Sequence, residues 1–138
     1  MVYEKHIELQ KAHLYLVEEG FTMLKAKDNV DFELEDAVEV DELTYQLVNG
    51  NPFVTIVDGR NVRSNMSHEA RQYFASNKKI TDIRKAQSIV VNNLHTKLLA
   101  NFYMNFYKPS NPIKIFRDFE EAEKWVRKIH KTYYPNSY

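Results

Sequence analysis

The sequence predicts an α/β domain built on a single mixed sheet, in which an antiparallel N-terminal hairpin is followed by parallel strands that helices connect. Two patterns support this fold class. Short apolar segments rich in β-branched residues alternate along the chain with segments whose apolar residues recur at helical spacing. Strands separated by helices pair in parallel, because each helix carries the chain back across the sheet. The 138 residues, 43% of them hydrophobic, suffice for one core, so residues 1–138 are expected to form one domain.

The first third of the chain is expected to begin with the hairpin. Residues 13–17 form a compact apolar run, residues 18–20 supply a turn, and residues 21–26 return as a partly alternating strand. Residues 33–49 then place apolar side chains on one helical face and acidic side chains elsewhere. This helix is expected to end at Gly50, because glycine suits the left-handed cap of a helix and a proline follows shortly after.

The remaining two thirds alternate strands with helices. Three apolar runs are typical of parallel strands covered on both faces: residues 53–57, 86–91 and 113–116. Helices are expected over residues 67–76, 93–107 and 118–130, each starting at a residue that can cap it. The last of these helices carries the clearest apolar stripe of the chain. Residues 131–138 are expected to form a loosely held tail.

Composition excludes several classes of site. The chain has no cysteine, which excludes disulfides, zinc–thiolate sites, iron–sulfur clusters and cysteine nucleophiles. The five histidines are scattered without metal-ligand spacing, so neither a metal nor another cofactor is expected. The charged N-terminal residues do not form a signal peptide, and no apolar run approaches the length of a membrane span. The expected location is therefore the cytoplasm, and the abundance of Asn, Lys and Tyr fits a bacterial source.

The formal net charge is zero, yet the charge is divided unevenly along the chain. Residues 1–50 carry 12 acidic and 4 basic side chains, whereas residues 51–138 carry 7 acidic and 15 basic ones. Two interpretations remain open: the acidic and basic segments lie side by side and screen one another, or they mark contacts with a partner. Nucleic-acid binding is not expected, because the basic cluster at residues 78–85 lacks interleaved aromatic residues and the domain as a whole is not basic.

The order of these elements resembles the STAS domain, the SpoIIAA-like fold of bacterial anti-sigma factor antagonists. Part of the sequence also resembles an uncharacterised bacterial subfamily of STAS-like domains, and the residues that carry this resemblance are Ser67–Arg71, Lys85, Ala86, Leu98–Phe102, Lys108, Pro109, Pro112, Phe116, Ala122 and Trp125. The resemblance covers residues 20–130. It implies a fold with a mixed sheet and a role in regulation through protein contacts.

The resemblance also implies a candidate phosphosite. In antagonist STAS domains, a phosphorylated serine lies at the start of a helix within an Asp-Ser-Ser-Gly type of motif. The matching stretch here, residues 65–68, keeps a hydroxyl only at Ser67 and lacks the Asp and the Gly. Ser67 is therefore a candidate phosphosite by resemblance and, on the residues alone, a helix cap.

Six polar residues follow two of the predicted parallel strands: Asp58, Arg60, Asn61, Asn92, Asn93 and His95. Ligands of open α/β sheets bind at the carboxyl ends of strands, so these residues form a candidate ligand crevice. A solvated turn and a polar helix start explain the same residues equally well.

Four aromatic residues recur at helical spacing after Asn93: Phe102, Tyr103, Phe106 and Tyr107. Such a stripe is usually core. The apolar residues nevertheless wrap around more of this helix than one sheet-facing stripe needs, so the stripe is also a candidate interface for a protein partner or a second copy, most simply in a homodimer.

These features predict a non-enzymatic STAS-like module that acts through protein–protein contact, with no catalytic residue. The alternative is a domain that binds a small ligand at the carboxyl ends of its parallel strands. The two hypotheses differ in what the structure should contain. A ligand-binding domain needs a concave, mostly apolar cavity, whereas an interaction module needs an exposed apolar patch.

Overall fold

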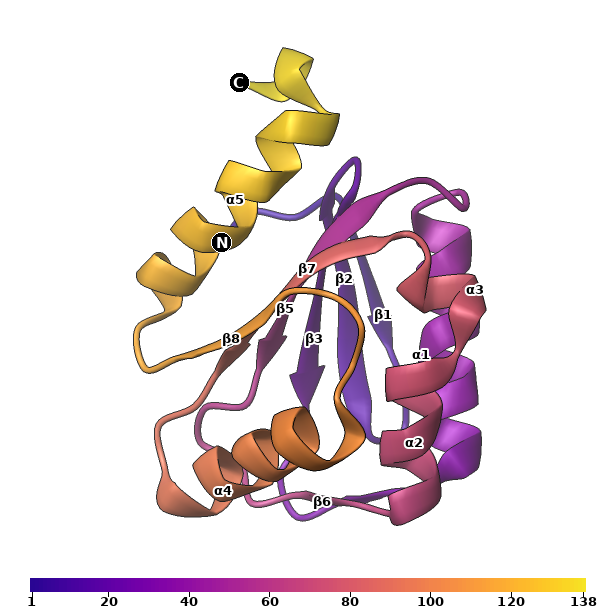
Figure 1. Ribbon diagram of the computed structural model, residues 1–138, viewed down its shortest axis with the longest axis vertical. Helices are drawn as coiled ribbons and strands as arrows, with labels where there is room; N and C mark the ends of the chain where they lie inside the picture. The colour runs from indigo at the N-terminus through magenta and orange to yellow at the C-terminus, as the bar shows by residue number, and fades with distance from the viewer.

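The computed structural model describes all 138 residues and contains a six-stranded mixed sheet in the order β1-β2-β3-β5-β7-β8 (Figure 1). The strands are β1 (Lys5–Glu8), β2 (Ala12–Glu18), β3 (Phe21–Ala26), β5 (Phe53–Asp58), β7 (Arg84–Val90) and β8 (Ile113–Phe116). The strands β1, β2 and β3 are antiparallel, and β3, β5, β7 and β8 run parallel to one another. This arrangement confirms the predicted fold class and adds β1, which the sequence pattern did not resolve as a separate strand.

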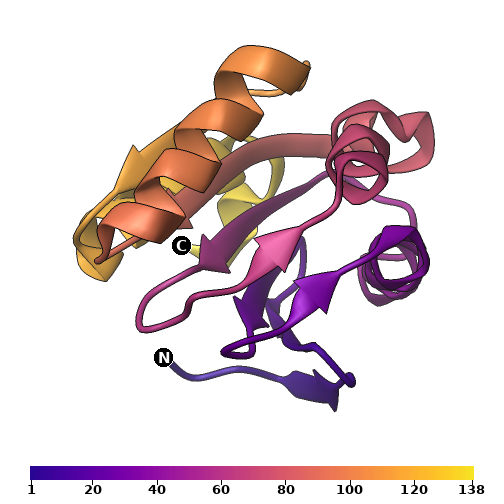
Figure 2. The ribbon, with the colours of Figure 1, turned by 90° about the horizontal axis from the view of Figure 1, so that it is seen from below.

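Helices cover both faces of the sheet, α5 on one side and the other helices on the opposite side (Figure 1). The helices are α1 (Leu34–Leu47), α2 (His68–Ser76), α3 (Lys78–Thr81), α4 (Leu94–Phe102) and α5 (Phe119–Tyr133). Two short strands, β4 (Asp31–Phe32) and β6 (Asn65–Met66), form a separate parallel pair and lie side by side in Figure 2. No helix is both long enough and apolar enough to cross a membrane.

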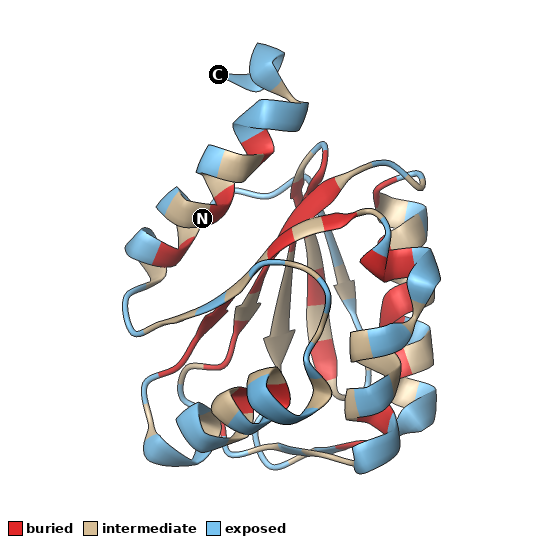
Figure 3. Cartoon of the chain, viewed as in Figure 1, coloured by how far each residue is buried: buried red, intermediate tan, exposed pale blue.

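The face under α5 is a conventional apolar core. Val54 and Ile56 of β5 pack there against Ala122 and Val126 of α5, and all four are at most 1% exposed. The inner side of α5 is buried and its outer side exposed (Figure 3), as the apolar stripe in the sequence predicts. Alternate residues of the same strands point to the opposite face, because side chains alternate across a strand.

The chain after α5 is attached to the domain, which differs from the expected loose tail at residues 131–138. The helix continues to Tyr133, and the Tyr134 hydroxyl donates a hydrogen bond to the carbonyl of Pro52 at 2.6 Å. The Tyr138 hydroxyl lies 2.8 Å from Nδ1 of His130, whose side chain is fully buried. The Nε2 atom of the same histidine lies 2.7 Å from the carbonyl of Glu19, in the turn between β2 and β3.

Acidic and basic segments lie side by side, as one of the two interpretations of the charge pattern expected. The Arg127 guanidinium lies 2.6 Å from the Glu18 carboxylate at the end of β2, and the Lys79 ammonium lies 3.2 Å from the Glu42 carboxylate on α1. Part of the acidic charge of the first 50 residues is therefore paired within the chain.

Replacing Trp125 tests the contact between α5 and the sheet. Trp125 is half-buried, packs against the α5-side core and lies 5.9 Å from the ring of Phe116, measured between ring centroids. We expect Trp125→Ala to lower the free energy of unfolding by about 3 kcal/mol, measured by urea denaturation with circular dichroism. Lys124→Ala, on the exposed side of the same helix, should change it by less than about 0.5 kcal/mol. An equal effect of both variants would contradict the packing described here.

Candidate functional site

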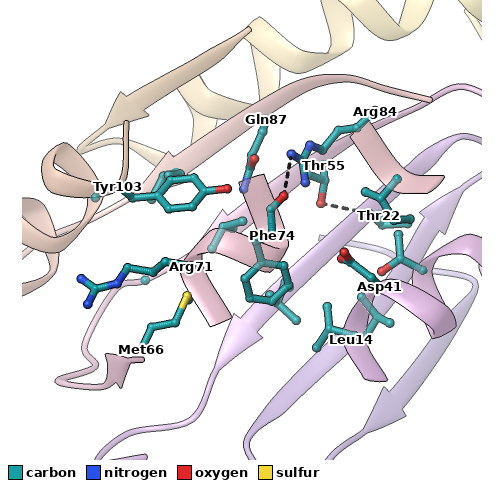
Figure 4. A pocket seen from close by; sticks show the side chains of 18 of the residues that line it. Leu14, Thr22, Asp41, Thr55, Met66, Arg71, Phe74, Arg84, Gln87 and Tyr103 are labelled. Carbon is teal, nitrogen blue, oxygen red and sulfur yellow. Dashed lines mark hydrogen bonds between the residues drawn. The ribbon is translucent and has the colours of Figure 1, made fainter. Parts of the chain in front are cut away.

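A cavity of about 160 Å³ lies on the face of the sheet opposite α5. It is enclosed by β3, β5 and β7 on one side and by α1, α2 and α4 on the other, and most of its lining is apolar (Figure 4). Large pockets of this kind, with a few convergent polar groups, are the common form of small-molecule sites. The sequence led us to expect a cavity near Asp58 and Asn92, but neither residue lines this one.

The strand alternation explains why polar groups face the cavity. Thr22, Thr55 and Gln87 occupy the positions of β3, β5 and β7 whose side chains point away from α5. The Thr22 hydroxyl donates to the Thr55 hydroxyl at 2.9 Å, so these two groups largely satisfy each other. The positions of β5 on the α5 side hold Val54 and Ile56, and that face of the sheet is apolar apart from Ser88 of β7.

Arg84 begins β7 and brings a positive charge to the cavity. Its side chain is only 4% exposed. Its Nη2 atom donates a long hydrogen bond of 3.4 Å to the carbonyl of Phe74 in α2, and its Nε atom is buried with no partner in the protein. The sequence placed this residue in an exposed basic cluster, and the structure instead buries it among the cavity residues.

Tyr103 lies where the helix after Asn93 changes its winding. Residues Tyr103–Tyr107 form a π-helical turn that continues α4, and such turns occur often at functional sites. Figure 4 shows the phenol of Tyr103 directed into the cavity, where its hydroxyl has no hydrogen-bond partner in the protein. Burial raises the pKa of Tyr103 to about 12, so the hydroxyl stays protonated at neutral pH.

Asp41 supplies the carboxyl group of the cavity from the inner face of α1. It is 4% exposed, and its Oδ2 atom accepts a hydrogen bond from Nδ2 of Asn77 at 3.0 Å. Burial raises the pKa of Asp41 to about 6, although the hydrogen bond from Asn77 and the positive charge of Arg84 both oppose the increase.

Arg71 lines the cavity from α2 and joins α2 to the π-helical turn. Its guanidinium carbon lies 5.2 Å from the ring centroid of Phe102 and 5.5 Å from that of Tyr107. Nδ1 of His68, one turn earlier in α2, lies 2.6 Å from the Tyr107 hydroxyl. Aromatic, cation–π and hydrogen-bond contacts thus hold this side of the cavity together.

The six residues of the predicted crevice do gather at the carboxyl ends of β5 and β7, but mostly bond to one another or to nearby backbone. The backbone N–H of Asn61 donates to Oδ1 of Asn92 at 2.8 Å, and Nδ2 of Asn92 donates to Oδ1 of Asn61 at 2.9 Å. Nδ2 of Asn93 donates to the carbonyl of Val62, and Nε2 of His95 lies 3.1 Å from the carbonyl of Ser64. Asn61, Asn92 and Asn93 line an open pocket whose lining contains no apolar residue, whereas Asp58, Arg60 and His95 do not line it.

Asp58 is part of an ion-pair cluster. Its carboxylate accepts two hydrogen bonds of 3.0 Å from Arg60, and Lys25 lies 3.8 Å away. Burial alone would raise the pKa of Asp58, but the hydrogen bonds from Arg60 and the charge of Lys25 outweigh it and hold the pKa below its ordinary value. A carboxylate held ionised in this way stabilises the loop after β5.

Two further sequence-predicted sites have clear positions. Ser67 is the N-cap of α2, where its hydroxyl accepts a hydrogen bond from the backbone N–H of Ala70 at 3.1 Å.

In the aromatic set, Phe102 and Phe106 are 45% and 61% exposed and Tyr107 is half-buried, but Tyr103 is buried in the cavity. Tyr103 therefore does not belong to an exposed interface.

The sequence reasoning missed Asp41 and Arg84. Asp41 had a detectable signal, because helical spacing places it on the same face as Ala37 and Thr44, both of which are buried. A carboxylate on the buried face of a helix is uncommon unless it is paired. Arg84 gave no such signal, since it stands among other basic residues just before an apolar run.

The fold and the site can now be compared with known proteins. The chain has a SpoIIAA-like fold: a solved structure of an uncharacterised protein of the DUF3478 family from Shewanella loihica PV-4, described as having that fold, matches it with a TM-score of 0.57. That match covers 88% of this chain and 90% of the other at 16% sequence identity, so it shows the fold alone. No curated protein matches the sequence. Residues 15–130 match the model of a domain of unknown function, DUF7793, and the chain belongs to this family.

The raised pKa of Asp41 makes a prediction about stability. The folded protein binds this proton more tightly than the unfolded chain, whose carboxyl has a pKa near 3.8, so ionisation of Asp41 destabilises the fold. Its contribution falls as the pH rises from about 4 to about 6 and stays low above that range. We expect Asp41→Asn to raise the free energy of unfolding by about 2 kcal/mol at pH 7.5 and to have little effect below about pH 4.

Urea denaturation at several pH values measures this difference. Glu39→Gln, which removes an exposed carboxylate from the same helix, should change the stability little at any pH. An Asp41→Asn variant that is less stable than the wild type at pH 7.5 would show that the carboxylate is favourably paired.

Proposed function

We propose that this domain binds a small, largely apolar organic molecule in the cavity between the sheet and α1, α2 and α4. One observation carries the proposal: the cavity is mostly apolar, yet three buried polar atoms of its lining residues, Nε of Arg71, Nε of Arg84 and the hydroxyl of Tyr103, have no partner in the protein. A buried hydrogen-bonding group without a partner costs about 1–3 kcal/mol, and a bound molecule with an acceptor would recover that energy.

The size of the cavity supports a small ligand. Its volume of about 160 Å³ is close to that of an engineered apolar cavity of about 150 Å³ that binds benzene in another protein. The ligand is therefore comparable to a single aromatic ring or a short aliphatic chain with a polar group.

We place the function in binding rather than in catalysis. The lining offers carboxyl, phenol and guanidinium groups, but it pairs no nucleophile with a hydrogen-bonded base. A binding function also agrees with the regulatory role that the STAS-like resemblance implies, since a ligand that stabilises one conformation alters what the domain contacts.

Binding of neutral apolar probes tests this proposal. We expect toluene, indole and hexanol to raise the melting temperature of the full chain, and the amide signals of residues around the cavity to shift in NMR titrations. Ala100→Leu adds bulk to a residue that lines the cavity, so it should weaken binding at least tenfold.

Asn105→Leu is the matched control, because it adds comparable bulk at an exposed position of the π-helical turn. It should leave the affinity unchanged. If none of the probes binds, or if both variants weaken binding equally, the cavity is not the ligand site.

A different observation favours a second function, self-association. Four large apolar side chains of α4 and the turn after it are exposed to solvent: Leu94 at 70%, Leu98 at 59%, Phe102 at 45% and Phe106 at 61%. A surface of this kind on a small domain is commonly covered by another chain. A two-fold homodimer would bury it against itself.

Sedimentation velocity at several salt concentrations tests the homodimer. We expect a dimer that persists at high salt, because apolar contacts are not screened, and Leu98→Glu should convert it to a monomer. Gln10→Glu adds the same charge in the exposed turn between β1 and β2, distant in sequence from α4, and should leave the dimer intact. A wild-type protein that stays monomeric at millimolar concentration would exclude this function.

A further inference from the structure

The charge of the cavity gives information on its ligand that its size does not. Three ionisable side chains other than Tyr103 line the cavity: Asp41, Arg71 and Arg84. Arg71 is only partly buried, and its guanidinium lies over the rings of Phe102 and Tyr107. The buried charges of the cavity are therefore those of Arg84 and Asp41. A buried charge without a close partner is unfavourable unless an ion of opposite charge compensates for it.

Arg84 is the deeply buried cation of this set. None of the ion pairs within 4.0 Å includes Arg84. Its guanidinium donates one long hydrogen bond of 3.4 Å, to the neutral carbonyl of Phe74, and the side chain that it approaches, Tyr103, is neutral as well. Arginine is rarely buried to this degree unless it is paired.

Asp41 does not fill this role. Its carboxylate accepts a hydrogen bond from Asn77, and burial raises its pKa by more than the positive charge of Arg84 lowers it. The cavity therefore retains a guanidinium that lacks a close carboxylate.

Tyr103 supplies a second donor near this cation. Its hydroxyl is buried without a partner, and Figure 4 shows it directed toward the part of the cavity between Gln87 and Phe74, the residue whose carbonyl Arg84 contacts. A guanidinium and a phenol hydroxyl together match the two oxygens of a carboxylate, one for each donor.

We infer that the molecule bound in this cavity is a small monocarboxylic acid, whose carboxylate accepts hydrogen bonds from Arg84 and Tyr103 and whose apolar part fills the rest of the cavity. The inference rests on the proposed function and adds the chemical class of the ligand. Arylacetic acids and unbranched acids of about six to eight carbons agree with the volume. A phosphate monoester carries a second charge that the lining does not match.

Matched pairs of acids and amides test the inference on the full chain. Isothermal titration at pH 7 would compare phenylacetate with phenylacetamide and hexanoate with hexanamide, which have similar shapes and differ in charge. We expect each acid to bind at least tenfold more tightly than its amide, and phenyl phosphate to bind more weakly than phenylacetate.

Three variants assign the preference to particular groups. Arg84→Met keeps the bulk of the side chain and should remove the preference for acids while leaving amide binding within about twofold. Tyr103→Phe should weaken acid binding about fivefold and amide binding less. Asp41→Asn removes the negative charge from the lining and should tighten acid binding several-fold. The exposed Arg63→Met is the control and should change nothing.

The outcomes separate the two proposals. Equal affinities for acids and amides, or an acid preference that survives in a folded Arg84→Met protein, would overturn the inference and leave the proposed function intact. If phenyl phosphate binds more tightly than phenylacetate, the ligand class is wrong. If acids, amides and the neutral probes all fail to bind, the proposed function fails as well. If Arg84→Met does not fold, the Tyr103→Phe and Asp41→Asn results decide.

Discussion

The two central parallel strands, β5 and β7, have to be covered on both faces, and most of the architecture follows from that requirement. Their backbone hydrogen bonds are satisfied within the sheet, so stability depends on what packs above and below them. The helix α5 covers one face with an apolar stripe in which Ala122 and Val126 are fully buried and Trp125 is half-buried. The connections between the strands supply the other cover, and they place α1, α2 and α4 against the opposite face.

The helices α1, α2 and α4 pack less completely against the sheet than α5 does. The polar groups of the candidate site lie on this less completely packed face. Threonine and glutamine replace aliphatic residues on the strands, and Asp41 and Arg84 lie buried among them. A close-packed interior would exclude such groups or pair them fully. Here some are paired, as Thr22 is with Thr55, and others have no partner in the protein. The face covered by α1, α2 and α4 is therefore less closely packed than the α5 face, and its unpartnered groups can hydrogen-bond to a ligand.

Much of the fold could be predicted because its signals are local. The apolar runs gave the parallel strands, and Ser67 caps α2 as its position before an apolar stripe indicates. The site was harder to predict, since burial of Arg84 depends on which helices close over β7. Tyr103 lies at helical spacing from Thr96, Leu99 and Ala100, which also line the cavity, whereas Phe102 and Phe106 lie on the exposed side of the same helix. The aromatic stripe therefore contains both a cavity residue and surface residues, and which of its sides faces the sheet depends on the tertiary structure.

The contacts that residues 131–138 make with the rest of the domain determine where a shortened version of the protein can end. The family match ends at residue 130, within α5 and at the buried histidine whose Nδ1 atom Tyr138 contacts. A fragment cut at that boundary would lose the Tyr134 hydrogen bond to Pro52 and the Tyr134 ring that packs over Gly20. It would also leave an imidazole nitrogen without its partner beside the turn between β2 and β3. The first residues, by contrast, are largely exposed, so affinity tags and fusion partners belong at the N-terminus.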